Sequence, residues 1–266
     1  MALSGFKQAA LAATLAAACS AGWAQGTSAT VKFNGQAYGG SSTTATLNFA
    51  RDPRTGSAST LSAGAGAFSI TLNNSSSFAS YCIEPFQFFA PGSTYTNYTL
   101  RTDEQNFKWS SGSPGLNGFD PARSAAIGQR LGQLWAYAGA NYGLGITPTH
   151  DSTKQTASTA LQWAIFNVLY DTDNSVKAGG AGNNFWITET SSNVSILNLA
   201  NTMLGQSQAY QFQYGVSVLT ATGNQDQLIA DGITTPVPEP GTLAMTMAGL
   251  LAVGFVARRR RLPQQG

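Results

Sequence analysis

Short runs of β-branched and aromatic residues dominate the first part of the chain, and several of them alternate with polar residues. Clusters of Gly, Ser, Asn and Pro separate these runs, a combination that predicts β-strands joined by turns. The predicted strands span residues 29–33, 45–49, 67–72, 78–89 and 95–101. The stretch 51–66 is rich in turn residues, so we expect a long hairpin loop there.

The apolar period changes in the second part of the chain. Apolar residues fall at helical spacing over 121–138, which predicts a first helix. They do so again in a second helix that ends at about residue 170, and Ser152 and Gln155 at its start have the spacing of a capping box. The second helix is apolar on two sides, so we expect both sides to be buried. The later predicted elements are a strand at 185–190, a helix at 192–204 and a closing strand at 210–220. The order predicts an α+β fold, a β-sheet sandwich or barrel-like core with an inserted helical segment.

The N-terminus has the three parts of a secretory signal peptide. Lys7 supplies the positive charge, residues 9–18 form an apolar segment too short to span a membrane, and a small-x-small site ends at Ala24. We therefore predict a signal peptide over residues 1–24, cleaved after Ala24. A competing interpretation is a lipoprotein box with Cys19 as the lipidated residue.

The C-terminus combines a rigid polar element, an apolar run and a basic cluster. Pro238, Glu239 and Pro240 cannot continue a helix or a sheet ladder, so they predict an extended segment. The uncharged run 241–257 is at the short end of a membrane-spanning helix. The basic cluster that follows consists of Arg258, Arg259, Arg260 and Arg261. Such a cluster stays in the cytoplasm, so we expect the rest of the chain to be exported.

This tail resembles the PEP-CTERM sorting signal of exosortase-processed proteins in Gram-negative bacteria, with Pro238, Glu239 and Pro240 at the position of the signature tripeptide. The resemblance implies an exosortase, a membrane protease, as partner. It also implies transient anchoring in the inner membrane, followed by transfer to the outer surface or the extracellular matrix. The alternative is a plain membrane anchor that is never cut.

Charge and composition exclude one class of partner. Lys7 and the four terminal arginines are five of the 14 basic residues, and Glu239 is one of the 12 acidic ones. Residues 25–236 therefore hold nine basic and eleven acidic residues, a net charge of −2, which offers no basic face for nucleic acid. The remaining composition, rich in Ser, Thr, Asn, Gly and aromatics, favours an extracellular structural or adhesive protein.

Candidate chemistry depends on one cysteine and one glutamine. After removal of the signal peptide Cys82 is the single thiol, at the end of a predicted strand, and Gln162 lies in the middle of the most apolar helix. An unpaired thiol in an oxidising compartment and a buried amide are both costly unless they are used or partnered. Attack of the thiol on the carboxamide would expel ammonia and leave an internal thioester. The alternative is a buried free Cys82 and a Gln162 that hydrogen-bonds a strand edge.

The segments around these residues, 81–84 and 161–166, resemble the two halves of the Cys-Gln thioester domains of Gram-positive surface adhesins. The resemblance implies a thioester between Cys82 and Gln162 that captures amines or hydroxyls of proteins or polysaccharides on a target surface. We divide the chain as follows: signal peptide 1–24, extracellular thioester-like α+β domain 25–232, linker 233–240, transmembrane sorting helix 241–257 and basic cytoplasmic tail 258–266.

The sequence also contains candidates for other kinds of site, each with a weaker motif than the Cys-Gln pair. Glu84 with Asp171 or Asp173 would be the acid/base pair of a secreted carbohydrate-active hydrolase, the runner-up function. The segment 171–174 lacks the Gly and the final Glu of a calcium loop, and His150 fits a surface loop better than a catalytic base. The tryptophans that could line a sugar cleft are Trp109, Trp135, Trp163 and Trp186. We therefore predict a non-enzymatic adhesion or biofilm-matrix module without metal or cofactor; a purely structural matrix protein without a thioester is a further alternative.

Overall fold

The computed structural model describes residues 26–39, 43–52, 54–101, 121–171, 173–178, 183–211 and 213–234. The chain divides into two compact units, Met1–Ile233 and Thr234–Gly266, and the barrel and helices belong to the first. Within the described ranges no helix has both the length and the apolar character needed to cross a membrane. The predicted signal peptide, sorting helix and basic tail lie outside these ranges.

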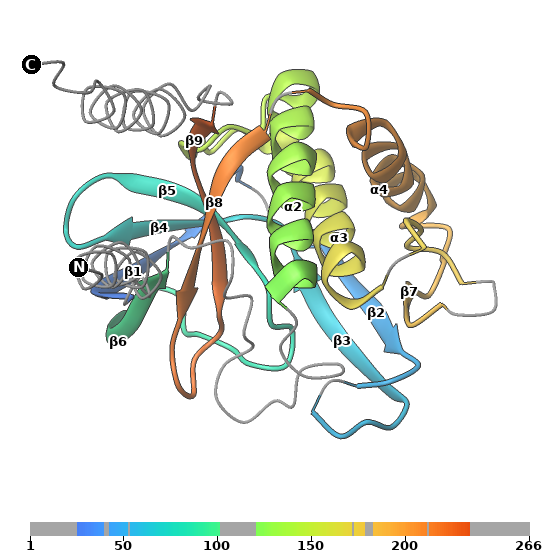
Figure 1. Cartoon of the computed structure of the whole chain (residues 1–266), viewed down its shortest axis with the longest axis horizontal. Helices are drawn as coiled ribbons and strands as arrows, with labels where there is room; N and C mark the ends of the chain where they lie inside the picture. Colours follow the sequence, from blue (N-terminus) through green and yellow to red (C-terminus); the bar gives the residue numbers. More distant parts are fainter. Residues whose placement is uncertain are drawn as a thin grey trace, which may run out of the picture. The chain divides into compact units, whose positions relative to one another are not determined.

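Six antiparallel strands close into a barrel (Figure 1). In barrel order they are β1 (Thr27–Gln36), β4 (Phe68–Leu72), β5 (Ser77–Cys82), β9 (Gln227–Thr234), β8 (Gln213–Thr220) and β6 (Thr94–Arg101). Alternate residues of β1, including Val31 and Phe33, point into the barrel and are fully buried. The pairings of β1 with β4 and with β6 each contain a register shift. Such bulges bend a strand sharply, and a small barrel needs this to close.

A second layer packs helices against a small sheet. Strands β3 (Ser59–Ala65), β2 (Thr43–Phe49) and β7 (Phe185–Ile187) form the sheet. The helices are α2 (Pro121–Tyr142), α3 (Gln155–Tyr170), which follows the short 3₁₀ helix η1 (Ser152–Lys154), and α4 (Val194–Ser207). In Figure 1 α3 lies between α2 and α4, and it contacts both helices as well as β3 and β7.

Helix α3 is the centre of the main core. It buries 13 of its 16 residues, so the prediction that both of its apolar sides are covered is confirmed. Its fully buried residues include Leu161, Trp163 and Ala164. Each large apolar side chain buried in this way contributes about 1.5–3 kcal/mol relative to exposure. Packing is therefore the main source of this helix's stability, since its N-cap residue, Lys154, makes no side-chain capping bond.

The predicted fold class is confirmed in outline, with a barrel core and helices inserted between strands, but several elements differ. The stretch 51–66 is not a long loop, because its second half is strand β3, paired with β2 along its whole length. Its Ser, Ala and Gly residues give a weak β signal, and cross-strand pairing supplies what propensity lacks. The strand predicted for 78–89 stops at Cys82, and strand β9 was not predicted.

The helix ends also differ from the prediction. Ser152 and Gln155 do not form a capping box; Asp151 caps η1 instead, with its carboxylate accepting from the N–H of Thr153 at 3.0 Å. Helix α2 continues past residue 138 to Tyr142 and ends at Gly143, whose φ of 66° lies in the left-handed region that glycine tolerates.

Candidate functional site

Strand β5 and helix α3 bring the two predicted thioester residues together. Cys82 is the last residue of β5, and Gln162 lies in the middle of α3. The main-chain N–H of Cys82 donates to Oε1 of Gln162 at 2.9 Å, and Nε2 of Gln162 donates to the main-chain oxygen of Cys82 at 2.7 Å. The glutamine amide thus pairs with the main chain of Cys82 as a neighbouring strand would, and it holds the helix against the end of β5.

Both residues are sealed from solvent. Gln162 is 1% exposed and Cys82 is 5% exposed. The thiol is free, and Sγ donates to the main-chain oxygen of Glu84 at 3.1 Å. Burial raises the pKa of the Cys82 thiol well above its usual value, because a thiolate would lose its hydration there. The thiol is therefore neutral and inaccessible to surface reagents in the folded chain.

The hydrogen bond from Cys82 to Oε1 has a chemical consequence. An N–H aimed at a carbonyl oxygen withdraws electrons from the carbonyl and would stabilise an oxyanion formed on it. Nucleophilic attack on Cδ of Gln162 would form such an oxyanion. The sulfur of the same residue is a candidate nucleophile, and its attack would require it to exchange the bond to Glu84 for contact with Cδ.

A buried polar triplet surrounds the site, and no motif in the sequence pointed to it. Gln225 and Asp226 precede β9, and Gln227 opens it; these side chains are 7%, 0% and 0% exposed. Cys82 pairs with Gln227 across the two strands, and the main-chain oxygen of Asp226 accepts from the N–H of Ile83 at 3.1 Å. The one sequence feature that marks this site is a run of three polar residues directly before the apolar run 228–230, and it is too common to have predicted a paired polar site.

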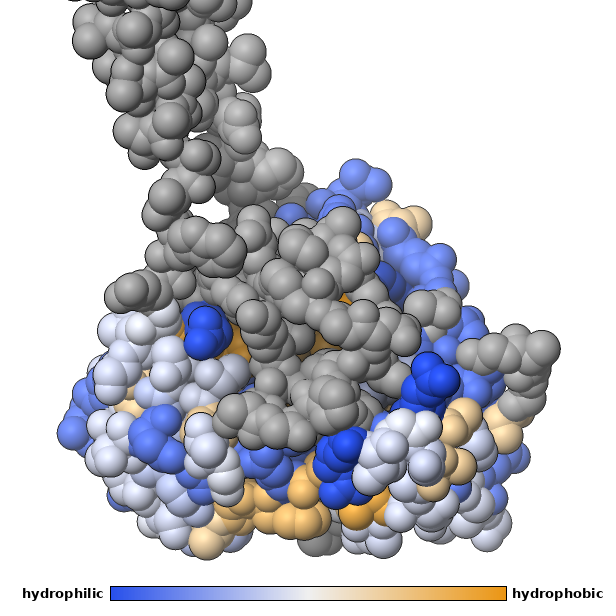
Figure 2. Space-filling view, turned by 60° about the horizontal axis from the view of Figure 1, so that its bottom comes forward, coloured by the Kyte–Doolittle hydropathy of each residue, from blue (hydrophilic) through white to orange (hydrophobic). Residues whose placement is uncertain are grey.

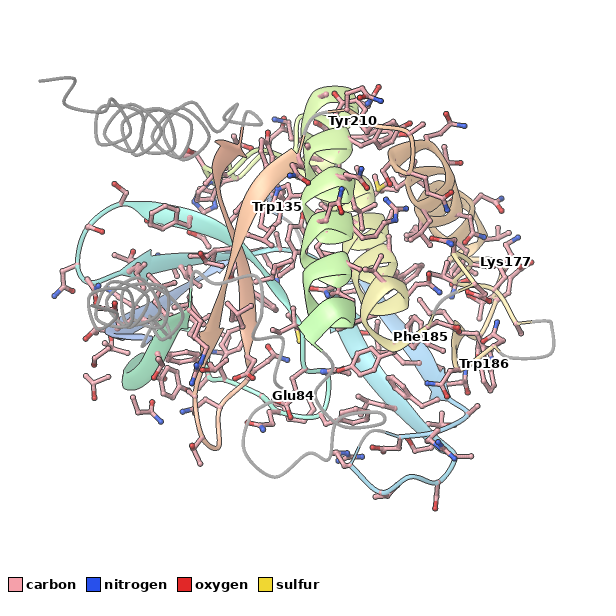
Figure 3. The ribbon with its side chains drawn as sticks, in the orientation of Figure 1. Glu84, Trp135, Lys177, Phe185, Trp186 and Tyr210 are labelled. Atoms are coloured by element: carbon pink, nitrogen blue, oxygen red, sulfur yellow. The ribbon has the colours of Figure 1, made fainter. Side chains whose placement is uncertain are left out.

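Acidic and aromatic groups lie around the segment that follows Cys82. Glu84 is 2% exposed, and its Oε1 accepts from Nε2 of Gln87 at 2.9 Å. Tyr170, at the end of α3, donates its hydroxyl to the main-chain oxygen of Ile83 at 2.9 Å. Figure 3 shows Glu84 near the junction of the barrel and the helices, with Phe185 beneath α3. This segment is held by hydrogen bonds from both layers, which restricts the movement of the thiol's acceptor.

The side chains proposed as an acid/base pair with Glu84 organise a loop instead. Oδ2 of Asp171 accepts from the main-chain N–H groups of Asn184 and Phe185 at 2.7 and 2.8 Å. The carboxylate of Asp173 accepts from the side chain of Asn167 and from the N–H of Ser175 at 3.0 and 2.9 Å. Asp171 therefore ties the end of α3 to β7, and Asp173 ties the loop after α3 back to the helix. In the described part of the chain no group of three His, Cys, Asp or Glu residues has the geometry to hold a metal ion.

The remaining candidate residues, the tryptophans and His150, differ in how far they are buried. Trp135 and Trp163 are fully buried, so they cannot line a surface cleft, whereas Trp186 on β7 is partly exposed at the edge seen in Figure 3. His150 is exposed in a loop, as predicted. Trp109, Cys19, Ala24, Pro238, Glu239, Pro240 and the arginines 258–261 lie outside the described residues.

The visible surface agrees with the composition. Figure 2 shows one face on which pale residues of near-neutral hydropathy are mixed with hydrophilic ones and with small apolar areas. In the described ranges Phe88 is the one large hydrophobic side chain that is strongly exposed, and the two ion pairs are Arg54–Asp52 and Lys177–Glu189. The sparse charges leave hydroxyl and amide groups as the main surface chemistry.

Comparison with known proteins identifies the tail. Residues 236–261 match the PEP-CTERM protein-sorting motif. The motif implies export, processing by an exosortase, which is a membrane protein, and a surface or extracellular location, so these predictions are confirmed at that level. A comparison with curated proteins gives no match.

One solved structure is similar to part of the chain. It is the N-terminal domain of the pilus tip adhesin Cpa of Streptococcus pyogenes, at 17% sequence identity and a TM-score of 0.41. The match covers 71% of this chain and 94% of that one. Similarity at this level says nothing about the chemistry of this chain.

Proposed function

We propose that this chain is an exosortase-sorted surface adhesion or biofilm-matrix module in which Cys82 and Gln162 form an internal thioester. The paired hydrogen bonds between the Gln162 amide and the Cys82 main chain carry the proposal. They hold the Gln162 carboxamide against the main chain of the residue that carries the thiol, across 80 residues of sequence, and this supports the proposal. The sorting motif supplies the location in which a covalent adhesive bond is useful.

Thioester formation needs no cofactor. The Sγ–Cδ bond forms, the Cδ–Nε2 bond of Gln162 breaks, and the thiol proton leaves on the nitrogen as ammonia. The Cys82 N–H lies where it can stabilise the charge that develops on Oε1 during this step. Gln162 and Cys82 are themselves almost fully buried, and this burial would exclude the water that hydrolyses a thioester.

In the capture of a target molecule the Cys82 sulfur is the leaving group. A target amine or hydroxyl adds to Cδ of Gln162, the Sγ–Cδ bond breaks, and the proton of the nucleophile passes to the sulfur. The product is an amide or ester link to a surface protein or polysaccharide, and the acyl group is consumed. We therefore infer a single-use adhesive bond rather than an enzyme that turns over.

Intact-mass measurement tests the thioester directly. The exported, purified chain should be lighter than its sequence mass by one ammonia, and methylamine should add its own mass and release one titratable thiol. Cys82→Ala should have its full sequence mass and should not react with methylamine. A wild-type mass that equals the sequence mass, with no methylamine addition, contradicts the proposal.

A second candidate is a non-covalent adhesion or matrix module with the same fold. It is favoured by the observation that Oε1 and Nε2 of Gln162 are already hydrogen-bonded to the Cys82 main chain. In that case the glutamine serves only to join helix and strand. The mass measurement separates the two candidates, because this one predicts no loss of ammonia.

The fate of the tail is tested independently of the thioester. A double substitution, Glu239→Ala with Pro240→Ala, removes the centre of the tripeptide and should leave a longer, membrane-retained species. Immunoblots of membrane, surface and medium fractions would measure this. Identical mobility and location of variant and wild type would favour the uncut anchor.

A further inference from the structure

The side-chain amide of Gln225 has a defined orientation next to the thiol. Its Oε1 accepts from Nε2 of Gln227 at 3.1 Å, and Oε1 of Gln227 in turn accepts from the hydroxyl of Ser80 at 3.1 Å. Because its oxygen is already directed at Gln227, the Nε2 of Gln225 must face the other way. There it donates to the main-chain oxygens of Gln87 at 2.8 Å and of Glu84 at 3.2 Å.

The second of these acceptors is shared with the thiol. The main-chain oxygen of Glu84 receives both the S–H of Cys82 and an N–H of Gln225. The Gln225 side chain lies close enough to the Cys82 sulfur to oppose the rise in the pKa of the thiol that burial causes. A buried sulfur that loses its proton thus has an amide N–H close by, on a side chain that shares its hydrogen-bond acceptor.

We propose that Gln225 is a positioning residue for the thioester, one that orients the thiol in the resting state and donates to the sulfur when it carries negative charge. The inference rests on the thioester proposed above. In formation, the charge appears as the thiol proton moves toward the departing nitrogen; in capture, it appears as the Sγ–Cδ bond breaks. In both steps one N–H of Gln225 would turn from Glu84 to the sulfur, while the other stays on Gln87.

The arrangement explains why a relay of three side chains is buried here. Ser80, Gln227 and Gln225 are each satisfied in turn, and the relay ends with an N–H beside the sulfur. Reversing the Gln225 amide would place its Nε2 opposite that of Gln227 and leave the carbonyls of Glu84 and Gln87 without this donor. The neighbours therefore fix which end of the amide faces Gln227, and this would persist while one N–H moves from Glu84 to the sulfur.

Two variants separate donation to the sulfur from mere support of the loop. Gln225→Met keeps the length of the side chain and removes the donor. Tyr98→Phe is the matched control. The hydroxyl of Tyr98 donates to the main-chain oxygen of Gln225 at 2.8 Å, so its removal disturbs Gln225 but leaves the side-chain amide of Gln225 in place. The full chain is exported and purified in each case, and thiol release by methylamine is followed over time with a thiol reagent under identical conditions.

Gln225→Met should slow thiol release by about ten- to a hundredfold, the range for losing one hydrogen bond to a charged group. Tyr98→Phe should stay within about threefold of wild type, near the lower end of what the loss of one neutral hydrogen bond costs, because this bond is made to the main chain and not to the sulfur. In a Gln162→Ala background, which holds a free Cys82, Gln225→Met should raise the thiol pKa measured by thiolate absorbance, and Tyr98→Phe should not.

The outcomes are distinct. A wild-type chain without the ammonia loss overturns the proposed function and this inference with it. A wild type that carries the thioester, together with a Gln225→Met variant that reacts as fast as Tyr98→Phe and has the same thiol pKa, overturns the role of Gln225 alone.

Discussion

Replacing Cys82 by alanine offers a thermodynamic test of the crosslink. The two hydrogen bonds that join Gln162 to residue 82 use only main-chain atoms of that residue. The substitution therefore removes the sulfur and leaves the Gln162 amide able to make both bonds, whereas the thioester form would already lack the bond from Nε2, which leaves as ammonia. Whatever stability is lost reports on the sulfur and on any covalent bond that it makes.

The expected loss follows from the sequence separation. A bond between positions 82 and 162, 80 residues apart, would restrict the unfolded chain and stabilise the fold by about 4.5 kcal/mol on the loop-closure estimate used for disulfides. Losing a buried thiol without a crosslink would cost only about 1 kcal/mol. Urea denaturation resolves a difference of this size.

Urea unfolding of wild type, Cys82→Ala and Ser80→Ala would measure the difference. Ser80 is the control because it is a fully buried residue of the same strand, two positions earlier, and its hydroxyl makes hydrogen bonds but no covalent link. We expect about 5 kcal/mol for Cys82→Ala and about 1 kcal/mol for Ser80→Ala. In thermal unfolding the first loss corresponds to about 10–20 °C for a domain of this size. A loss for Cys82→Ala no larger than that of the control would refute the crosslink.

Two further predictions concern the fold itself. Gly132→Ala should destabilise the protein by about 1–3 kcal/mol, because the added methyl would collide with the main-chain oxygen of Tyr214 on β8; Gly205→Ala, in a helix with nothing near the new methyl, should stabilise by about 0.5–1 kcal/mol. Urea midpoints would show both signs, and a stabilised Gly132→Ala would contradict the close packing of α2 on the barrel. Burial raises the pKa of Tyr81 and Tyr170 well above the usual value of about 10, so the unfolded chain releases these protons first and stability should fall as the pH rises above about 10. Equal urea midpoints at neutral pH and above about pH 10 would contradict this pH dependence.

Local patterns predicted the elements whose signals are strong. The alternation around Val31 and the two-sided apolar helix around Gln162 led to β1 and α3, and both are present. Strand β3 was missed because its Ser, Ala and Gly residues resemble a loop, and its strand geometry depends on pairing with β2. Strand β9 was missed because polar residues open it, and their partners lie far away in the sequence.

The address of the protein and the two residues proposed to react can be recognised in the linear chain alone. The sorting tail is a contiguous pattern, and a lone thiol and an amide on an apolar helix are visible without coordinates. How these groups meet depends on the three-dimensional fold, which sets the amide against the main chain of Cys82 and the thiol against the main-chain oxygen of Glu84. The same holds for Gln225, whose orientation is set by Gln227. Hydrogen-bond direction between residues distant in sequence depends on sheet register and on packing, and neither is encoded in any local pattern.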